Sequence, residues 1–339
     1  MKNIALINFG GLGDEILFLP VIQSLKKTYP DSKITLVTEP RSVGISQLTS
    51  LINQIIPCDV KSKFRIFELL KLILRLRRRH FDMIISAGAS PFISVILFLT
   101  GIKERYGYDT GALSRFLLTK AINLNKKQYA GNMYHDLVAS ICKQDAELPK
   151  IEIENPNITN PLAGSLELPE SDKKIILIHP GSSKLSKQKG IIKSYDNWVE
   201  LIEKLQNTDK YQLVLAGGPD DADVINKIIA ELGDSKIFNM YGKTKNIKDL
   251  IRLIKKSDLL LCIDSAPLHL AIGVNKKVLA IFGPTDEKKL VPENENFKVI
   301  FNHCACRPCL WDKRDKCCDN INCLKIPVEK IFEEVEKML

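Results

Sequence analysis

The chain alternates short β-rich runs with helical patterns, and this alternation occurs in two successive series. Parallel sheets produce such a pattern, because each crossover between parallel strands needs a helix. A stretch rich in Pro, Asn and Ser, residues 152–169, separates the two series and is typical of a linker. The pattern therefore predicts an α/β protein with two doubly wound domains. The expected strands cover residues 4–8, 33–38, 83–86, 174–179, 212–216, 259–263 and 277–282, and the expected helices residues 15–28, 43–51, 195–206, 222–232, 247–256 and 266–272.

Length and composition exclude several classes of protein. Hydrophobic residues make up 45% of the chain, too many for a disordered segment, and 339 residues exceed what one compact core usually serves. The longest apolar run, residues 92–99, is far shorter than the ~18 residues that span a bilayer. The first strand follows Met1 without a signal-peptide pattern. We therefore expect a cytoplasmic protein.

The net charge of +9 favours an anionic partner, which is a nucleic acid, a phosphorylated ligand or a membrane surface. Much of this charge lies in KSKFRIFELLKLILRLRRRHFD, residues 61–82, where apolar residues at helical spacing accompany a cluster of arginines. The helix either packs on the core with a solvated basic end or lies on an anionic lipid surface. The second interpretation would make the protein peripheral on the inner membrane.

The first strand ends in the turn NFGGLGDEIL, residues 8–17. Its glycines Gly10, Gly11 and Gly13 bring Asp14 to a helix start, where a carboxylate caps free N–H groups and suits the helix dipole. These glycines do not form the G-x-G-x-x-G fingerprint, which argues against a nicotinamide-dependent oxidoreductase. Asp14 is therefore either a helix cap or a functional carboxylate that the turn presents.

The turn HPGSS follows the strand expected at residues 174–179. Its small residues Ser182 and Ser183 permit close approach of a phosphate, and Lys193 supplies a point charge shortly afterwards. Lys187 and Lys189 are alternative phosphate lysines. A solvated basic loop is the competing interpretation for all three lysines.

The next strand ends in AGGPDD, which contains Gly217 and Asp220. An acidic residue beyond such a turn accepts hydrogen bonds from ribose hydroxyls in dinucleotide sites. Glycine followed by Asp also suits an ordinary turn and helix cap. The pattern leaves open both interpretations, and which acidic residue among 220–223 would be involved.

The strand end DSAPLHLA has the most distinctive polar pattern. Asp264 and Ser265 follow a very apolar strand, and a helix that begins near Ala266 would point its N–H groups at an anion. His269 lies one turn inside that helix, as a ligand contact or as a packed core histidine. The neighbouring strand ends in IFGPT, which places Thr285 beside them.

Together these stretches resemble glycosyltransferase family 9, the bacterial heptosyltransferases that build the lipopolysaccharide inner core. The matching stretches are GGLGDEILFLPVIQSLKKTYPDSKITLVT at residues 10–38, HPGSS, AGGPDD, DSAPLHLA and IFGPT. The resemblance implies a GT-B fold, in which two Rossmann-like domains face a central cleft. Residues 1–155 would bind the acceptor and residues 170–325 the nucleotide sugar, while the helix at residues 326–339 would pack back on the N-terminal domain.

The same resemblance implies an inverting, metal-independent transfer of a sugar, heptose from ADP-heptose, to a lipopolysaccharide-core or related glycan or glycolipid acceptor. Asp14 would be the general base, and Lys193 would neutralise the departing diphosphate. Gly10, Gly11 and Gly13 would form the acceptor loop. The donor-binding residues would be Ser182, Ser183, Gly217, Asp220, Asp264, Ser265, Ala266, His269 and Thr285.

Six of the nine cysteines lie within CACRPCLWDKRDKCCDNINC, residues 304–323. Cys306, Cys309, Cys318 and Cys323 approach the spacing of metal ligands, so a structural zinc site is an alternative to packed or redox-linked thiols. We expect no metal or other cofactor and no specific nucleic acid. A non-catalytic metal- or RNA-binding protein remains a second candidate function, although the chain lacks the aromatic motifs of common RNA-binding modules.

Overall fold

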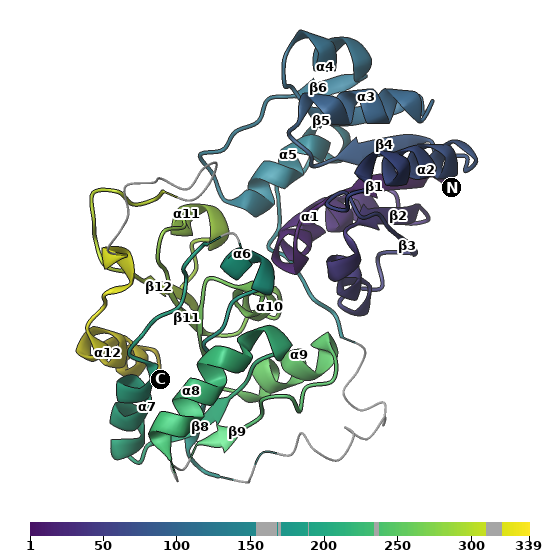
Figure 1. The fold of residues 1–339 in the computed structure, drawn as a ribbon. Coiled ribbons are helices and arrows are strands. Elements are labelled where there is room, and N and C mark those ends of the chain that lie inside the picture. The colour runs from purple at the N-terminus through teal and green to yellow at the C-terminus, as the bar shows by residue number, and fades with distance from the viewer. Residues whose placement is uncertain (154–167, 169–170, 189, 234–236, 310–320) are drawn as a thin grey trace. The chain divides into compact units, whose positions relative to one another are not determined.

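The computed structural model describes residues 1–153, 168, 171–188, 190–233, 237–309 and 321–339. The chain divides into two compact units, Met1–Ile153 and Glu154–Leu339. Each unit contains one six-stranded sheet with helices packed against it (Figure 1). Within the described ranges, no helix is both long enough and apolar enough to cross a bilayer.

The N-terminal unit is built on a parallel sheet with the strand order β3-β2-β1-β4-β5-β6. Its strands are β1 Asn3–Ile7, β2 Lys33–Thr38, β3 Gln54–Pro57, β4 Met83–Ser86, β5 Glu104–Tyr108 and β6 Lys120–Ile122. Helix α1 (Leu12–Thr28) packs on α5 (Ala130–Cys142) and on the 3₁₀ helix η1 (Pro40–Gln47). Helix α3 (Pro91–Leu99) contacts both α2 (Arg65–Arg77) and α4 (Ala112–Leu117). These helices form two separate layers, one on each face of the sheet. Crossovers between parallel strands are right-handed, so the layer changes when the chain reverses its direction across the sheet between β3 and β4.

The C-terminal unit repeats this topology, with the strand order β12-β11-β10-β7-β8-β9. Read in the reverse direction, from β9 to β12, its six strands follow the same order as β3 to β6 in the N-terminal sheet. The strands are β7 Lys174–His179, β8 Tyr211–Leu215, β9 Phe238–Asn239, β10 Leu259–Ile263, β11 Val278–Ile281 and β12 Phe297–Ile300. The helices are α6 Lys184–Gln188, α7 Trp198–Asn207, η2 Pro219–Asp221, α8 Ala222–Leu232, α9 Ile247–Lys256, α10 Ala266–Gly273, α11 Glu287–Leu290, η3 Asn322–Leu324 and α12 Val328–Met338. Both sheets therefore have a switch point, between β1 and β4 and between β7 and β10, where doubly wound folds bind ligands.

The last helix, α12, belongs to the C-terminal unit. It packs on α7, and its side chains Val328, Ile331, Val335 and Met338 belong to the apolar core of the C-terminal unit. Its polar face adds an ion pair of 2.8 Å between Glu336 and Lys210. The apolar side chains of α12 are thus buried within the C-terminal unit, whereas the family resemblance implied that this helix would pack on the N-terminal domain.

Candidate functional site

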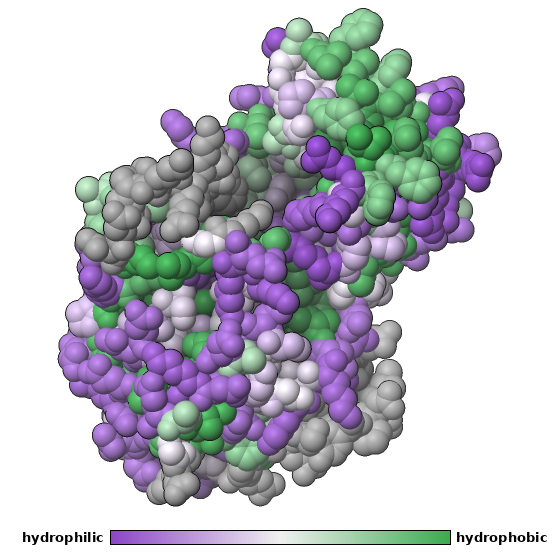
Figure 2. Space-filling model, in the orientation of Figure 1, coloured by the Kyte–Doolittle hydropathy of each residue, from purple (hydrophilic) through white to green (hydrophobic). Residues whose placement is uncertain are grey.

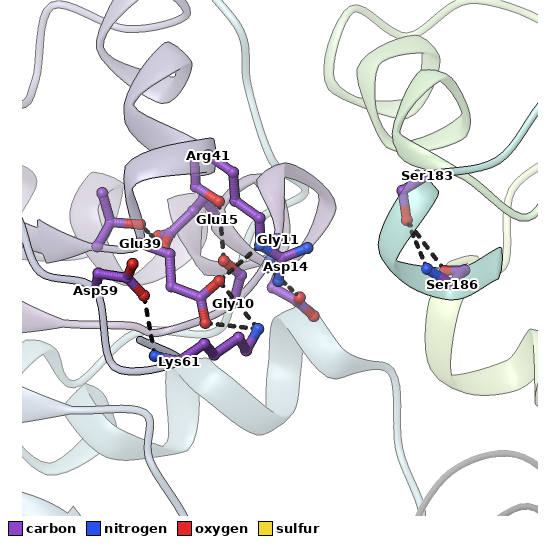
Figure 3. A network of polar contacts seen from close by, with 12 residues as sticks. Gly10, Gly11, Asp14, Glu15, Glu39, Arg41, Asp59, Lys61, Ser183 and Ser186 are labelled. Atoms are coloured by element: carbon purple, nitrogen blue, oxygen red, sulfur yellow. Dashed lines mark hydrogen bonds and ion pairs between the residues drawn. The ribbon is translucent and has the colours of Figure 1, made fainter. Parts of the chain in front are cut away.

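The glycine turn after β1 holds Asp14 at the start of α1 (Figure 3). Its Oδ2 accepts a hydrogen bond of 2.7 Å from the N–H of the N-cap residue Gly11, so Asp14 closes a capping box from the third position of α1. A Cβ on Gly10 would lie only 2.3 Å from the Cβ of Asp14, and this explains why the position needs glycine. Gly13 lies inside the first turn of α1, not in the preceding loop. Asp14 remains half-buried at the switch point of the sheet.

Glu15, which we did not single out from the sequence, is fully buried beside Asp14. It accepts hydrogen bonds from the hydroxyl of Thr38 and, at 3.3 Å, from the amide of Asn8. Burial raises the pKa of Glu15 well above its usual range, and the neighbouring Asp14 charge adds to the rise against the lowering by Thr38. The sequence offered one signal, an acidic residue directly before an apolar stretch of the helix.

A second acidic group at this edge is held by two cations (Figure 3). The buried Glu39, which follows β2, lies 2.6 Å from Nε of Arg41 and 2.7 Å from Nζ of Lys61. The Arg41 guanidinium would lie 3.5 Å from a Cβ placed on Gly11. The glycine turn therefore has both carboxylates and cations beside it, and only the turn itself was predicted from the sequence.

In the C-terminal unit, the ends of β10 and β11 meet at a buried ion pair. Nζ of Lys193 lies 2.6 Å from Oδ2 of Asp264, and the hydroxyl of Thr285 donates to the same oxygen at 2.6 Å. Burial alone would raise the pKa of Asp264, but the charge and hydrogen bonds of Lys193 and Thr285 lower it below its usual value. Three residues far apart in the sequence are thus assembled into one charged group.

The helix α10 begins directly after Asp264, with Ser265 as its N-cap and Ala266 as its first residue. Its first N–H groups and its positive dipole end therefore lie next to the ion pair. His269 is buried inside this helix, and its charge when protonated favours the ionised form of Asp264. The residues that the sequence placed in DSAPLHLA are in this way brought together with Lys193 and Thr285.

The end of β7 packs against Asp221 and not against Asp220. Nε2 of His179 lies 3.7 Å from Oδ2 of the buried Asp221, and that oxygen accepts from the N–H of Gly218 at 2.8 Å. A Cβ on Gly181 would come within 1.8 Å of the Asp221 carboxylate. Burial lowers the pKa of His179 despite this neighbouring charge. Asp221 therefore closes the turn after β8 onto the turn after β7.

Asp220 and Ser183 belong to a separate, exposed group around α6. The carboxylate of Asp220 accepts from the N–H of Lys184 at 2.8 Å, and Nζ of Lys187 donates to the main-chain oxygen of Asp220. The hydroxyl of Ser183 contacts that of Ser186 at 3.1 Å (Figure 3). Among the alternative lysines, Lys187 thus contacts this turn, whereas Lys189 lies outside the described residues.

Ser182 and Gly217 are the remaining predicted donor residues, and both are buried. Ser182 is 8% exposed in the turn after β7, and a Cβ on Gly217 would lie 2.4 Å from Cδ1 of Ile225. Gly217 therefore permits close packing of α8 on the end of β8. This packing explains the glycine without a contact to ribose.

Arg307 is a further residue of this edge that the sequence analysis did not identify. Its guanidinium donates to the main-chain oxygens of Gly283 and Thr285 at 2.6 and 2.9 Å, and it pairs with Glu287 at 2.8 Å. It also lies over the ring of Phe301, 3.7 Å from its centroid. Arg307 thereby fixes the turn that carries the Thr285 hydroxyl. The only signal in the sequence was an arginine within the cysteine-rich stretch.

Three of the four candidate metal-ligating cysteines, Cys306, Cys309 and Cys323, lie in the described part of the chain. Sγ of Cys306 lies 3.8 Å from Sγ of Cys304, and Cys323 is buried in the C-terminal core. Cys318 lies outside the described residues. Among the residues that the structure describes, no group of three or more His, Cys, Asp or Glu side chains is placed to hold a metal ion.

Comparisons with known proteins identify the family to which these features correspond. The model of glycosyltransferase family 9 (heptosyltransferase) matches residues 69–318. Lipooligosaccharide heptosyltransferase 2 of Campylobacter jejuni is 26% identical over 99% of this chain and 90% of its own length. Lipopolysaccharide heptosyltransferase 3 of Escherichia coli is 24% identical over 96% of each chain. The solved structure of the E. coli ADP-heptose lipopolysaccharide heptosyltransferase II matches with a TM-score of 0.77 and 21% identity, over 100% of this chain and 98% of that one.

Proposed function

The chain belongs to glycosyltransferase family 9, the heptosyltransferases, and from this premise we propose an inverting transfer of heptose from ADP-heptose to a lipopolysaccharide-core or related glycan acceptor. The relatives from C. jejuni and E. coli, which carry heptosyltransferase names, support the sugar and the acceptor class. The E. coli structural neighbour, named for ADP-heptose, supports the donor. Membership of a glycosyltransferase family argues against both the nicotinamide-dependent oxidoreductase and the non-catalytic metal- or RNA-binding protein.

We assign the donor to the C-terminal unit. The observation that carries this assignment is the buried group of Lys193, Asp264 and Thr285 at the switch point, directly before the N-terminus of α10. Lys193 and the first N–H groups of α10 would take up the negative charge that grows on the leaving diphosphate, which makes a metal ion unnecessary. The hydrogen bonds that Lys193 and Thr285 donate to the Asp264 carboxylate both end on Oδ2, and Oδ1 would accept from a hydroxyl of the sugar.

We assign the acceptor to the N-terminal unit and the role of general base to Asp14. In an inverting transfer the acceptor oxygen attacks the anomeric carbon while the bond to the diphosphate breaks, and the hydroxyl proton must leave. Asp14 is half-buried at the switch point, and its capping bond uses only one of its two oxygens, Oδ2. Glu15 is fully buried and its carboxylate already accepts from Thr38 and Asn8, so an acceptor hydroxyl reaches it less readily than it reaches Asp14.

The substitution Asp14→Asn separates the two roles of this side chain. Asn keeps an oxygen that can accept the Gly11 N–H, so the cap survives while the base is lost. We expect turnover of ADP-heptose to fall by about 10² to 10⁴, with the calorimetric affinity for ADP unchanged. The exposed Asp31→Asn, in the same unit as Asp14, serves as the matched control.

Two results would count against the proposal in different ways. Wild-type turnover in Asp14→Asn would leave Asp14 as a helix cap alone. Absence of any binding of ADP or ADP-heptose to the wild-type protein would remove the donor assignment itself.

A further inference from the structure

The N-terminal unit exposes an unusual concentration of large apolar side chains. Fourteen such side chains are exposed among the described residues, and ten of them lie on or next to α2, α3 and α4. We call these ten the apolar face. They are Phe64, Ile66, Phe67, Leu70, Leu74, Phe92, Phe98, Leu99, Leu113 and Phe116.

Helix α2 shows that this exposure is not a by-product of core packing. Its inner stripe, Leu72, Ile73 and Leu76, is buried against the sheet. A second stripe at positions i, i+3 and i+7, formed by Phe67, Leu70 and Leu74, leaves more than half of each side chain exposed. A surface helix normally carries one apolar stripe and polar residues opposite. Helix α2 therefore has an apolar surface that the fold itself does not cover.

The neighbouring helices of the same layer also expose large apolar side chains. Phe92 on α3 is 59% exposed and Phe116 on α4 is 83% exposed. Because α3 contacts both α2 and α4, the exposed groups lie on adjacent elements. Figure 2 shows hydrophobic surface over the part of the N-terminal unit where Figure 1 places α3 and α4. Contiguous exposed apolar surface of this kind marks an interaction site.

Cations accompany these apolar side chains. Nζ of Lys71 lies 4.3 Å from the ring centroid of Phe67, and the guanidinium of Arg105 lies 5.5 Å from that of Phe98. On α2 and directly after it, Arg75, Arg77 and Arg78 have no acidic partner within the described part of the chain. Basic side chains next to aromatic and aliphatic ones are typical of surfaces that lie at the headgroup level of a bilayer.

We propose that the apolar face docks on an anionic lipid bilayer, with its aromatic and leucine side chains in the acyl boundary and the surrounding cations on headgroup phosphates. Charge favours this occupant over a second copy of the chain, because two such faces would bring their arginines together. The attachment involves α2, α3 and α4 jointly, and it concerns a surface remote in sequence from Asp14 and Asp264. It would hold the enzyme at the surface in which a glycolipid acceptor resides.

Vesicle co-sedimentation tests the docking. Wild-type protein should bind vesicles of phosphatidylcholine mixed with phosphatidylglycerol more strongly than vesicles of phosphatidylcholine alone, and salt should weaken the preference. Phe67→Ser/Phe116→Ser should lower the partition coefficient about tenfold or more, since each ring loses its burial in lipid. Arg75→Glu/Arg78→Glu should abolish the preference for the anionic lipid. Because all four side chains are exposed, the substitutions leave the core intact.

Matched controls come from the C-terminal unit. Ile192→Ser removes a 45% exposed apolar side chain, and Lys255→Glu/Lys256→Glu reverses two exposed charges on α9; both should sediment as wild type. Equal sedimentation of the apolar-face variants and wild type would overturn the proposal. The proposal would also be overturned if the wild-type protein dimerised without vesicles and only the Phe67→Ser/Phe116→Ser variant lost this dimerisation. Calorimetry with ADP on every variant keeps this outcome separate from failure of the proposed function, because none of these residues belongs to the donor site.

Discussion

The two units share one topology but close their first strand ends in different ways. In the N-terminal unit, Gly10 follows β1 and packs against Asp14 of the same turn. In the C-terminal unit, Gly181 follows β7 and packs against Asp221, which comes from the end of the neighbouring strand β8. In both cases a glycine makes room for a carboxylate. The first contact is local and the second is made only when the sheet assembles.

The pKa values of the buried carboxylates at the two switch points shift in opposite directions. Glu15 and Asp264 are both almost completely buried. The pKa of Glu15 is raised by burial, because hydroxyl and amide donors only partly offset the loss of water. The pKa of Asp264 is lowered, because Lys193 and Thr285 outweigh the same effect of burial. The presence of a cation thus decides the direction of the shift at equal burial.

The largest effect on stability should come from breaking the ion pair of the C-terminal unit. Asp264→Asn leaves Lys193, whose side chain is only 17% exposed, without its counter-charge, and should cost about 3 to 5 kcal/mol in the free energy of unfolding. Urea titration of Asp264→Asn, Lys193→Met and the double variant measures the coupling. A double variant as unstable as the sum of the two single variants would mean that the pair is not coupled.

A smaller effect should distinguish the two glycines. Gly181→Ala must displace Asp221, which lies in η2 after the neighbouring strand β8. The substitution should cost about 1 to 3 kcal/mol in the free energy of unfolding. Gly10→Ala should cost less, because Asp14 and its turn can shift together, but it should lower turnover by moving the proposed base. Thermal unfolding and turnover of both variants test the contrast. Equal losses of stability would show that local and long-range contacts are equally rigid here.

The smallest effect should appear as a dependence of stability on pH. A raised pKa means that the folded protein holds the Glu15 proton more tightly than the unfolded chain, so this contribution is present at low pH. It is lost as pH rises from about the unfolded value of 4.5 through the raised folded pKa, by at most about 1.4 kcal/mol per pH unit. Glu15→Gln should remove that loss, whereas the contribution of Asp264 should disappear in the opposite direction, as pH falls through its lowered folded pKa. Unfolding curves of wild type and Glu15→Gln with parallel pH profiles would exclude a buried Glu15 with a raised pKa.

Regular elements with strong apolar runs were predictable with their bounds. The strands Met83–Ser86, Lys174–His179 and Leu259–Ile263 and the helix Ala222–Leu232 occur as the sequence analysis expected. The segment expected as a helix at residues 43–51 is the 3₁₀ helix Pro40–Gln47. Helix α1 begins three residues before its expected start, because Gly11 rather than Asp14 is its N-cap. The strands β5 and β6 were not predicted, since short mixed runs such as Glu104–Tyr108 lack a clear period.

The sequence by itself determined the two doubly wound series, the family and the turn that holds Asp14, because these depend on periodicity and on contacts between near neighbours. Tertiary structure decided the rest. It paired Lys193 with Asp264, buried Asp221 in place of Asp220, shifted the pKa values of Glu15 and Asp264 through their partners, and left the apolar face exposed. These outcomes depend on which strand ends the parallel register brings together and on which helical stripe the sheet covers, and no local pattern in the chain carries that information.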